Sequence, residues 1–319
     1  MLVNIAILAA GFTLLVKGAD WLVGSASALA RSLGVSDLVI GLTIVAFGTS
    51  APELAVSLLA SFQGSAGLSI GNVVGSNTCN ILLILGASSI IYPLFAARGT
   101  VWKEIPLMLL AVAVLMVASN DALLDGAASS AISRADGLVL LLFFAVFLVY
   151  VAQIVANERT GNTEMRPPFS VKRIGLMILG LAMLVAGARL VVTGAVELAD
   201  KLGMSKSFVG LTVVAIGTSL PEFATSVVAA YRKNSDLAVG NIVGSNIFNV
   251  FFILGTSALA APLPCGMGLN ADLTVMAIAS ILLFLAMFLG KPRHQVQRYE
   301  GAFFLVSYAA YLAWLVKRG

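Results

Sequence analysis

The sequence predicts an all-α membrane protein with ten transmembrane helices, arranged as two inverted-topology repeats of five. Three observations lead to this prediction: the apolar composition, a succession of apolar segments long enough to cross a bilayer, and an internal repeat. Of the 319 residues, 60% are apolar and 11% are charged, and the mean hydropathy is +1.02. A soluble domain carries roughly 25% charged residues to wet its surface, so a lipid bilayer is the solvent that fits this chain.

Apolar segments recur along nearly the whole chain, and a membrane-spanning helix needs about 20 such residues. They predict spans at 4–30, 37–62, 69–93, 104–119, 134–155, 173–199, 206–231, 238–261, 272–290 and 300–316. The polar segment 156–172 contains Pro167 and Pro168 and predicts a cytoplasmic linker. We therefore expect a first repeat at 1–155 and a second at 173–319, which together form one integrated domain.

The Lys and Arg residues predict how the chain lies in the membrane. With both termini outside, the cytoplasmic connections hold Arg31, Arg98, Lys103, Arg159, Arg166, Lys172, Arg173, Arg232, Lys233, Lys291, Arg293 and Arg298. The outer side then holds Arg134, Lys201, Lys206, Lys317 and Arg318. This positive-inside bias predicts a multi-pass protein of the cell (inner) membrane with both termini non-cytoplasmic. The net charge of +4 thus reports orientation, and we expect no nucleic-acid partner.

Two strings recur at an offset of 169 residues. GLTIVAFGTSAPELAVSLLAS from Gly41 returns as GLTVVAIGTSLPEFATSVVAA from Gly210, and IGNVVGSNTCNILLILG from Ile70 returns as VGNIVGSNIFNVFFILG from Val239. A repeat at a fixed period indicates a duplicated structural unit. Because each unit has five predicted spans, an odd number, the second unit must enter the membrane from the opposite face.

Two acidic residues, Glu53 and Glu222, lie deep in predicted spans at matching repeat positions. An ionisable side chain at membrane depth costs about 2.5–3.5 kcal/mol on insertion scales, so its presence indicates function. A lone intramembrane Glu could be a structural hydrogen-bonding group. Two glutamates that each end the same string, Gly-Thr-Ser-x-Pro-Glu, indicate instead that both belong to one site.

Helical spacing places hydroxyl groups beside each carboxylate. Thr49 and Ser50 precede Glu53 by four and three residues, so the three side chains share one helix face. Pro52 has no N–H to donate and its ring crowds the preceding turn, so it opens the helix there and frees backbone carbonyl groups. The second repeat supplies the same groups from Thr218, Ser219, Pro221 and Glu222. Such oxygen ligands suit sodium and calcium, whereas His and thiolate ligands for transition metals are missing.

The second string, Gly-Asn-x-Val-Gly-Ser-Asn-x-x-Asn, predicts the other wall of the site. Asn72, Ser76 and Asn80 fall at i, i+4 and i+8 on one helix face, and Asn241, Ser245 and Asn249 are their counterparts. A structural alternative is that the glycines serve helix contact, with the amides as interhelical bonds. We expect both roles, with close approach at Gly71, Gly75, Gly240 and Gly244, and ion coordination by the amides and serines.

The paired GTSxPE and GNxxGSN strings resemble the signature repeats of the calcium/cation antiporter superfamily, specifically its sodium/calcium exchanger family of the short prokaryotic type. The resemblance implies ten helices in two inverted halves and exchange of Ca2+ against Na+ by alternating access. It implicates as metal ligands Ala46, Thr49, Ser50, Glu53, Ser76, Asn80, Ala215, Thr218, Ser219, Glu222, Ser245 and Asn249, with the two alanines acting through their carbonyl oxygens. Some members, including potassium-dependent ones, carry Asp at the position of Asn249, and proton-coupled members carry a further acidic motif that is absent here.

Other functions stay open at this point. A proton-coupled or broad-specificity cation exchanger is the nearest alternative, and a passive cation channel is a more distant one. An enzyme is not expected, because neither a nucleophile–base pair nor a catalytic metal motif appears. The expected partners are the lipid bilayer and inorganic cations, without a cofactor and without a required oligomer.

Overall fold

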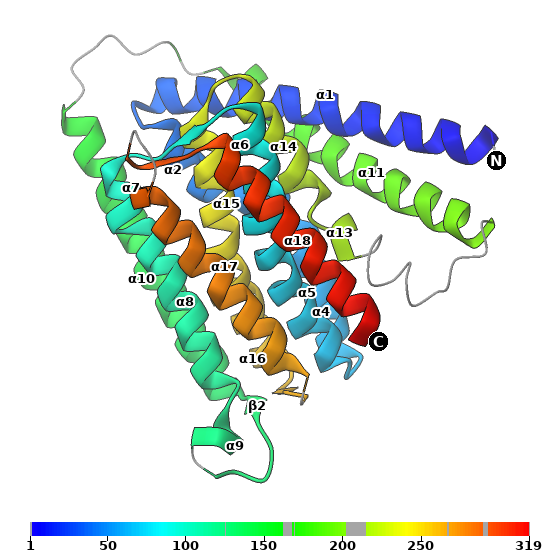
Figure 1. Ribbon diagram of the computed structural model, residues 1–319. Helices are drawn as coiled ribbons and strands as arrows, with labels where there is room; N and C mark the ends of the chain where they lie inside the picture. The colour runs from blue at the N-terminus through cyan, green and yellow to red at the C-terminus, as the bar shows by residue number, and fades with distance from the viewer. Residues whose placement is uncertain are drawn as a thin grey trace.

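The computed structural model describes residues 2–124, 126–161, 168, 170–201, 215–266, 268–289 and 293–318. These residues are mainly helical (Figure 1). With η for π-helical turns, the first elements are α1 (Leu2–Leu33), α2 (Asp37–Ile40), η1 (Gly41–Val45), α3 (Ala46–Thr49), α4 (Ala51–Phe62), α5 (Ala66–Cys79), η2 (Asn80–Leu85), α6 (Gly86–Ile91), β1 (Leu94–Phe95), α7 (Arg98–Trp102), α8 (Glu104–Ala118), α9 (Asp121–Leu124), β2 (Ala131–Ile132) and α10 (Arg134–Gly161). Then follow α11 (Val171–Lys201), α13 (Ala215–Gly217), α14 (Leu220–Tyr231), α15 (Ser235–Phe248), η4 (Asn249–Leu254), α16 (Gly255–Ala260), β3 (Leu263–Pro264), α17 (Leu269–Leu289), β4 (Gln295–Val296) and α18 (Arg298–Arg318).

Eight helices of the described residues are long and apolar enough to cross a membrane, and a bent pair makes up to nine. The bent pair, Asp37–Thr49 and Ala51–Phe62, corresponds to the predicted span 37–62 and turns by 47° at the break. The predicted span 206–231 begins outside the described residues, and α13 and α14 are its described parts. The chain is therefore a multi-pass helical membrane protein, in agreement with its composition.

The two segments that carry the Gly-Thr-Ser-x-Pro-Glu strings are each interrupted at the serine. The helix that begins after the serine has a proline in its first turn. Ser50 separates α3 from α4 with φ −83° and ψ 7°, and Ser219 precedes α14 with φ −84° and ψ 5°. Pro52 and Pro221 occupy the first turns that follow. A proline is tolerated in the first turn of a helix but not in its interior, so each helix restarts at this point.

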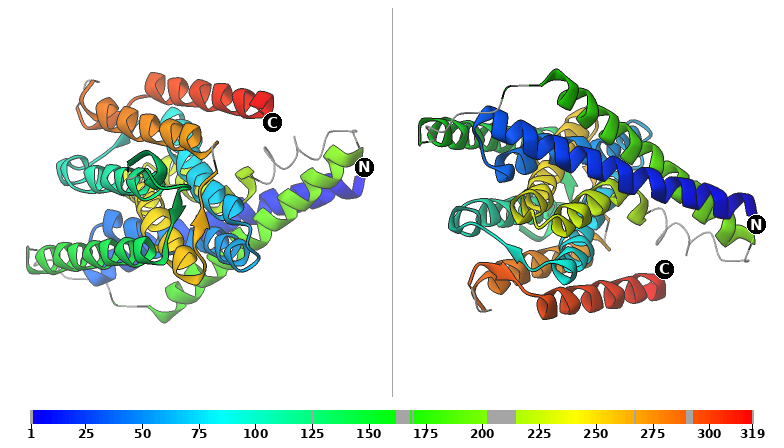
Figure 2. Two further views of the ribbon diagram at one scale, coloured as in Figure 1. Left: turned by 90° about the horizontal axis from the view of Figure 1, so that it is seen from below. Right: turned by 90° about the horizontal axis from the view of Figure 1, so that it is seen from above.

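Helix α15 and its continuation form the centre of the bundle. The apolar stretch of Ser235–Ala260 is 94% buried, against 17% for those of α10 and α18. Figures 1 and 2 show α1 and α11 side by side, running obliquely away from the other helices. Their contact depends on glycine: a Cβ at Gly187 would lie 2.8 Å from the carbonyl oxygen of Gly11, and one at Gly180 would lie 2.8 Å from that of Gly18.

Two short antiparallel strand pairs join segments that are distant in the sequence. Strand β1 pairs with β4, where Leu94 lies opposite Val296, and β2 pairs with β3, where Ala131 lies opposite Pro264. Each pair combines one strand from before residue 156 with one from after residue 172. The two predicted halves are therefore connected at these strands as well as through the helices.

The motif glycines of the second repeat have the close contacts that the sequence predicts. A Cβ at Gly240 would lie 2.8 Å from the carbonyl oxygen of Leu38, and one at Gly244 would lie 2.7 Å from that of Leu42. These glycines do permit close backbone approach. A Cβ at Gly71 or Gly75 would meet nothing within 4 Å among the described residues. The segment of the second repeat equivalent to Leu38 and Leu42, at 207 and 211, lies outside the described residues, so the expected close approach at these two glycines stays a prediction.

Candidate cation-binding site

The two intramembrane glutamates lie in matching first turns, Glu53 in α4 and Glu222 in α14. Each residue is only 1% exposed. The helix breaks described above place the hydroxyl of the preceding serine beside the break rather than on a continuous helix. This geometry allows each serine to reach across the molecule to the other half.

The serines and glutamates are connected crosswise. The hydroxyl of Ser50 donates to Oε1 of Glu222 at 2.8 Å, and that of Ser219 donates to Oε1 of Glu53 at 3.3 Å. Each carboxylate therefore receives a hydrogen bond from the repeat that does not contain it. The two acidic groups belong to one buried cluster, as the sequence predicts.

Serines from α5 and α15 extend this cluster. The Ser50 hydroxyl lies 3.0 Å from that of Ser245, and the Ser219 hydroxyl lies 3.2 Å from that of Ser76. The Ser76 hydroxyl also lies 3.5 Å from Oε1 of Glu53. All of these residues are buried, so the cluster is a connected set of hydroxyl and carboxylate oxygens closed off from bulk water.

The two threonines of the predicted ligand set lie at the edge of the cluster, where their hydroxyls contact Asn241 and Asn72. The hydroxyl of Thr49 lies 3.0 Å from the carbonyl oxygen of Val45 and 3.2 Å from Oδ1 of Asn241. The hydroxyl of Thr218 lies 3.4 Å from Oδ1 of Asn72.

The predicted alanine ligands lie in the segments before the breaks. Ala46 begins α3, is buried, and its carbonyl oxygen accepts from the backbone N–H of Ser50 at 3.0 Å. Ala215 begins α13. The Thr49 hydroxyl also lies 3.3 Å from this oxygen, but it has a single proton and its shorter contact is with Val45 at 3.0 Å. When Thr49 donates to Val45, the second lone pair of the Ala46 oxygen is open to a ligand.

Asn80 and Asn249 are held by two asparagines that the sequence interpretation did not single out. The amide nitrogen of Asn80 donates to Oδ1 of Asn246 at 2.9 Å, and that of Asn249 donates to Oδ1 of Asn77 at 2.9 Å. Asn77 and Asn246 end the Gly-Ser-Asn string of each repeat, and this repetition is the signal that could have identified them. Their role here is to fix the orientation of the two predicted amide ligands.

Four buried oxygens of the cluster have no hydrogen-bond donor among the described residues: Oε2 of Glu53, Oε2 of Glu222, Oδ1 of Asn80 and Oδ1 of Asn249. Buried polar atoms in folded proteins are nearly always satisfied, so a group of unsatisfied acceptors requires an explanation. A cation supplies the missing partner for acceptors and could not do so for donors. All four atoms belong to residues in the predicted ligand set.

The chemistry of these groups favours hard cations. In the part of the chain that the structure describes, no group of three or more His, Cys, Asp or Glu is placed to hold a metal ion. The cluster instead combines two carboxylates with hydroxyl and amide oxygens. Oxygen-only ligand sets suit sodium and calcium better than transition metals.

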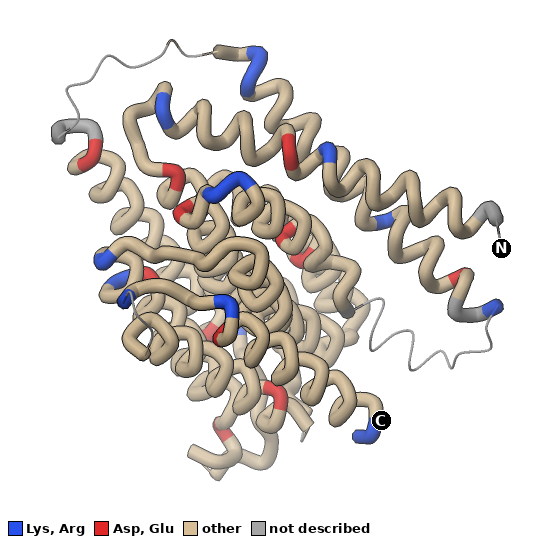
Figure 3. Tube along the Cα trace, turned by 45° about the horizontal axis from the view of Figure 1, so that its top comes forward, with Lys and Arg blue, Asp and Glu red and all other residues tan. Residues whose placement is uncertain are grey.

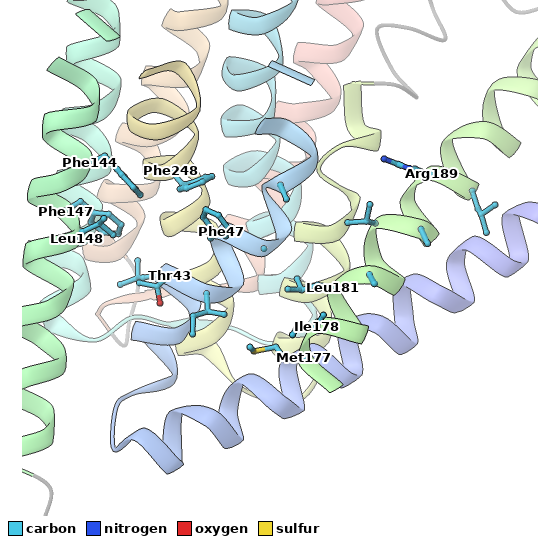
Figure 4. Close-up of a pocket in the computed structure, with 18 residues that line it drawn as sticks. Thr43, Phe47, Phe144, Phe147, Leu148, Met177, Ile178, Leu181, Arg189 and Phe248 are labelled. Carbon is cyan, nitrogen blue, oxygen red and sulfur yellow. The ribbon is translucent and has the colours of Figure 1, made fainter. Parts of the chain in front are cut away.

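A cavity of about 1170 Å3 lies outside the carboxylate cluster, between α3, α10 and α11 (Figure 4). Its lining is mostly apolar and aromatic, with Phe47, Phe144 and Phe248 on one side and Leu181 on the other. Arg189, the one charged residue among the described residues that line it, is a cation. None of the described residues that line it is a predicted ligand, and the positive charge of Arg189 does not suit a bound cation.

Comparison with known proteins identifies the family of the chain. The family model described as sodium/calcium exchanger protein matches residues 3–153 and 172–317. The putative antiporter CaxA of Alkalimonas amylolytica is 37% identical over 321 residues, covering 98% of each chain, and the sodium/calcium exchanger MaX1 of Methanosarcina acetivorans is 35% identical over 347 residues, again covering 98% of each. A solved structure of the sodium-calcium exchanger NCX_Mj, soaked with 10 mM Na+ and no Ca2+, superimposes with a TM-score of 0.82 at 35% identity, covering 98% of each chain.

These matches extend over nearly the whole chain and confirm the resemblance that the paired motifs predict. They also agree with the helical, multi-pass architecture and with a role in moving inorganic cations. The chain therefore belongs to the sodium/calcium exchanger family of membrane transporters.

Proposed function

We propose that this protein exchanges Ca2+ against Na+ across the membrane by alternating access, with the buried cluster as the single ion site. The observation that carries the proposal is the set of four unpartnered oxygens, two from each repeat, next to crosswise serine–glutamate hydrogen bonds. In this proposal the ligands are the twelve residues predicted from the sequence. Asn77 and Asn246 position two of them.

The charge of the cluster explains why ions would exchange rather than leak. Glu53 and Glu222 together neutralise one calcium ion, and the same oxygens can hold several sodium ions instead. Moving an empty, doubly charged site through a membrane is costly, whereas moving a neutralised one is not. Because the two loads compete for the same ligands, one ion species must leave before the other is carried back.

The duplicated architecture supports alternating access. The bounds of α4, α5, η2 and α6 all recur at the offset of 169 residues in α14, α15, η4 and α16. We propose that the chain has ten spans in two inverted repeats of five, at 1–155 and 173–319, joined by a cytoplasmic linker at 156–172. In this arrangement both termini lie outside the cytoplasm and the protein resides in the cell (inner) membrane.

Sodium is proposed as the coupling ion for two reasons. The acidic motif of proton-coupled relatives is absent from the Gly-Asn helices α5 and α15. In addition, MaX1 and NCX_Mj are both named as sodium/calcium exchangers.

Flux measurements in proteoliposomes test the proposal. We expect an outward sodium gradient to drive calcium uptake, and an outward proton gradient without sodium not to do so. Equal uptake with either gradient would replace sodium by protons as the coupling ion. Calcium flux without any counter-ion would reject exchange and favour a channel.

A further inference from the structure

A second polar site lies away from the carboxylate cluster. It is a cavity of about 530 Å3 between α1, the start of α11 and the end of α14. Among the described residues that line it, Lys172, Arg173 and Arg232 are cationic and Asp20 is the one acidic residue. The cavity therefore carries an excess of positive charge, opposite to the charge that the ion site requires.

Arg232 is fixed in place within this cavity. Its guanidinium group forms an ion pair with Asp20 on α1. A Cβ at position 24 would lie 3.0 Å from Nη1 of Arg232, so Gly24 leaves the space that the guanidinium needs to lie against α1. A guanidinium has five N–H donors, and the contact with Asp20 leaves others directed at the cavity.

The two cations of α11 are available for a ligand. Lys172 and Arg173 are exposed, and neither forms an ion pair within the described residues. With Arg232 they place three positive groups around one cavity, a geometry that suits a phosphate group.

The surroundings of the cavity are those of a membrane interface. Trp21 lines it and is 38% exposed, and Leu176 provides an apolar contact one turn into α11. Aromatic side chains gather at the level of the lipid headgroups, and basic pockets between membrane helices bind acidic headgroups. Figure 3 shows basic residues near the start of α11, on the side that the charge distribution predicts to be cytoplasmic.

We propose that this cavity binds the phosphate headgroup of an acidic phospholipid, with Lys172, Arg173 and Arg232 as its ligands. The site goes beyond the proposed exchange function, since its ligand is an anion that is not transported. A lipid bound here joins α11 to the end of α14. Glu222 lies on the same helix, ten residues or about 15 Å from Arg232.

Native mass spectrometry of the full-length protein in detergent tests this proposal by titration with phosphatidylglycerol or phosphatidylcholine. We expect preferential binding of phosphatidylglycerol, and affinity lower by roughly 30-fold in Lys172→Gln/Arg173→Gln, about 5-fold for each cation removed. The charge-conserving Lys172→Arg/Arg173→Lys should keep the binding. These side chains are exposed, so the variants should fold as the wild type does.

The matched control is Arg98→Gln/Arg298→Gln, which removes two exposed cations that do not line the cavity. We expect this control to bind phosphatidylglycerol as the wild type does. Equal loss in the control, or full binding by Lys172→Gln/Arg173→Gln, would overturn the proposal. A competition experiment with inorganic phosphate distinguishes a lipid headgroup from free phosphate as the ligand. The lipid assignment fails if free phosphate displaces phosphatidylglycerol. Because lipid binding requires no transport, its outcome is independent of the exchange experiment.

Discussion

Replacement of Glu53 by Gln gives the sharpest test of the ion site. The amide has nearly the same shape, and its oxygen can still accept from Ser219, which lies 3.3 Å from Oε1 of the glutamate. What the variant loses is one of the two negative charges and the unpartnered Oε2. Removing one partner from a buried charge pair costs about 3–5 kcal/mol, which corresponds to calcium affinity lower by roughly 10²–10³-fold or more.

Isothermal titration of purified protein with calcium measures this loss, and thermal unfolding without ions provides a second readout. We expect calcium binding to fall while stability without ions is kept or increases, because the variant no longer buries two carboxylates in one cluster. Glu104→Gln is a matched control: Glu104 is also buried, but Tyr150 donates to it outside the ion site. Wild-type calcium affinity in Glu53→Gln, or an equal loss in Glu104→Gln, would refute the reasoning.

Three further predictions concern the remaining parts of the site and its support. Ser219→Ala removes a donor to a buried carboxylate and should lower calcium affinity by about 10-fold or more in titration, since such bonds contribute about 1.5–3 kcal/mol. Asn249→Asp adds a third carboxylate and should tighten calcium binding and slow calcium release, which stopped-flow measurements with a chelator would detect. Gly244→Ala should destabilise the protein by about 1–3 kcal/mol because a backbone oxygen lies 2.7 Å from the new Cβ. Thermal unfolding of the variant beside the wild type measures this loss.

The acidic pair and its serines could be predicted because their signal is local. Helical spacing brings the hydroxyls into the same cluster as the carboxylates, and the prolines fix where the helices break. Spacing did not predict the partners, because each serine donates to the glutamate of the other repeat. The structure confirms these breaks at Ser50 and Ser219. The repeat in the sequence then indicates that both halves contribute equally to one cluster.

Other features depend on contacts that a repeat does not encode. The π-helical turns that begin at Asn80 and Asn249 have no sequence signal that we recognised, although such turns occur frequently at functional sites. The roles of Asn77 and Asn246 arise from pairing between the halves, which is visible only in three dimensions.

The pattern of hydrogen bonds implies that neither half can form the ion site alone. The hydrogen bonds that Ser50 and Ser219 donate to the glutamates both cross from one repeat to the other, as do the amide bonds of Asn80 and Asn249. A separated half would therefore keep its carboxylate but lose the serine donor that the other half supplies, and burying that charge would be less favourable. The two strings therefore depend on each other, because a change in the serine of one half removes a hydrogen bond from the glutamate of the other. A double-mutant cycle on Ser50 and Glu222 should show coupling in calcium binding, whereas Ser50 and Glu104 should behave additively.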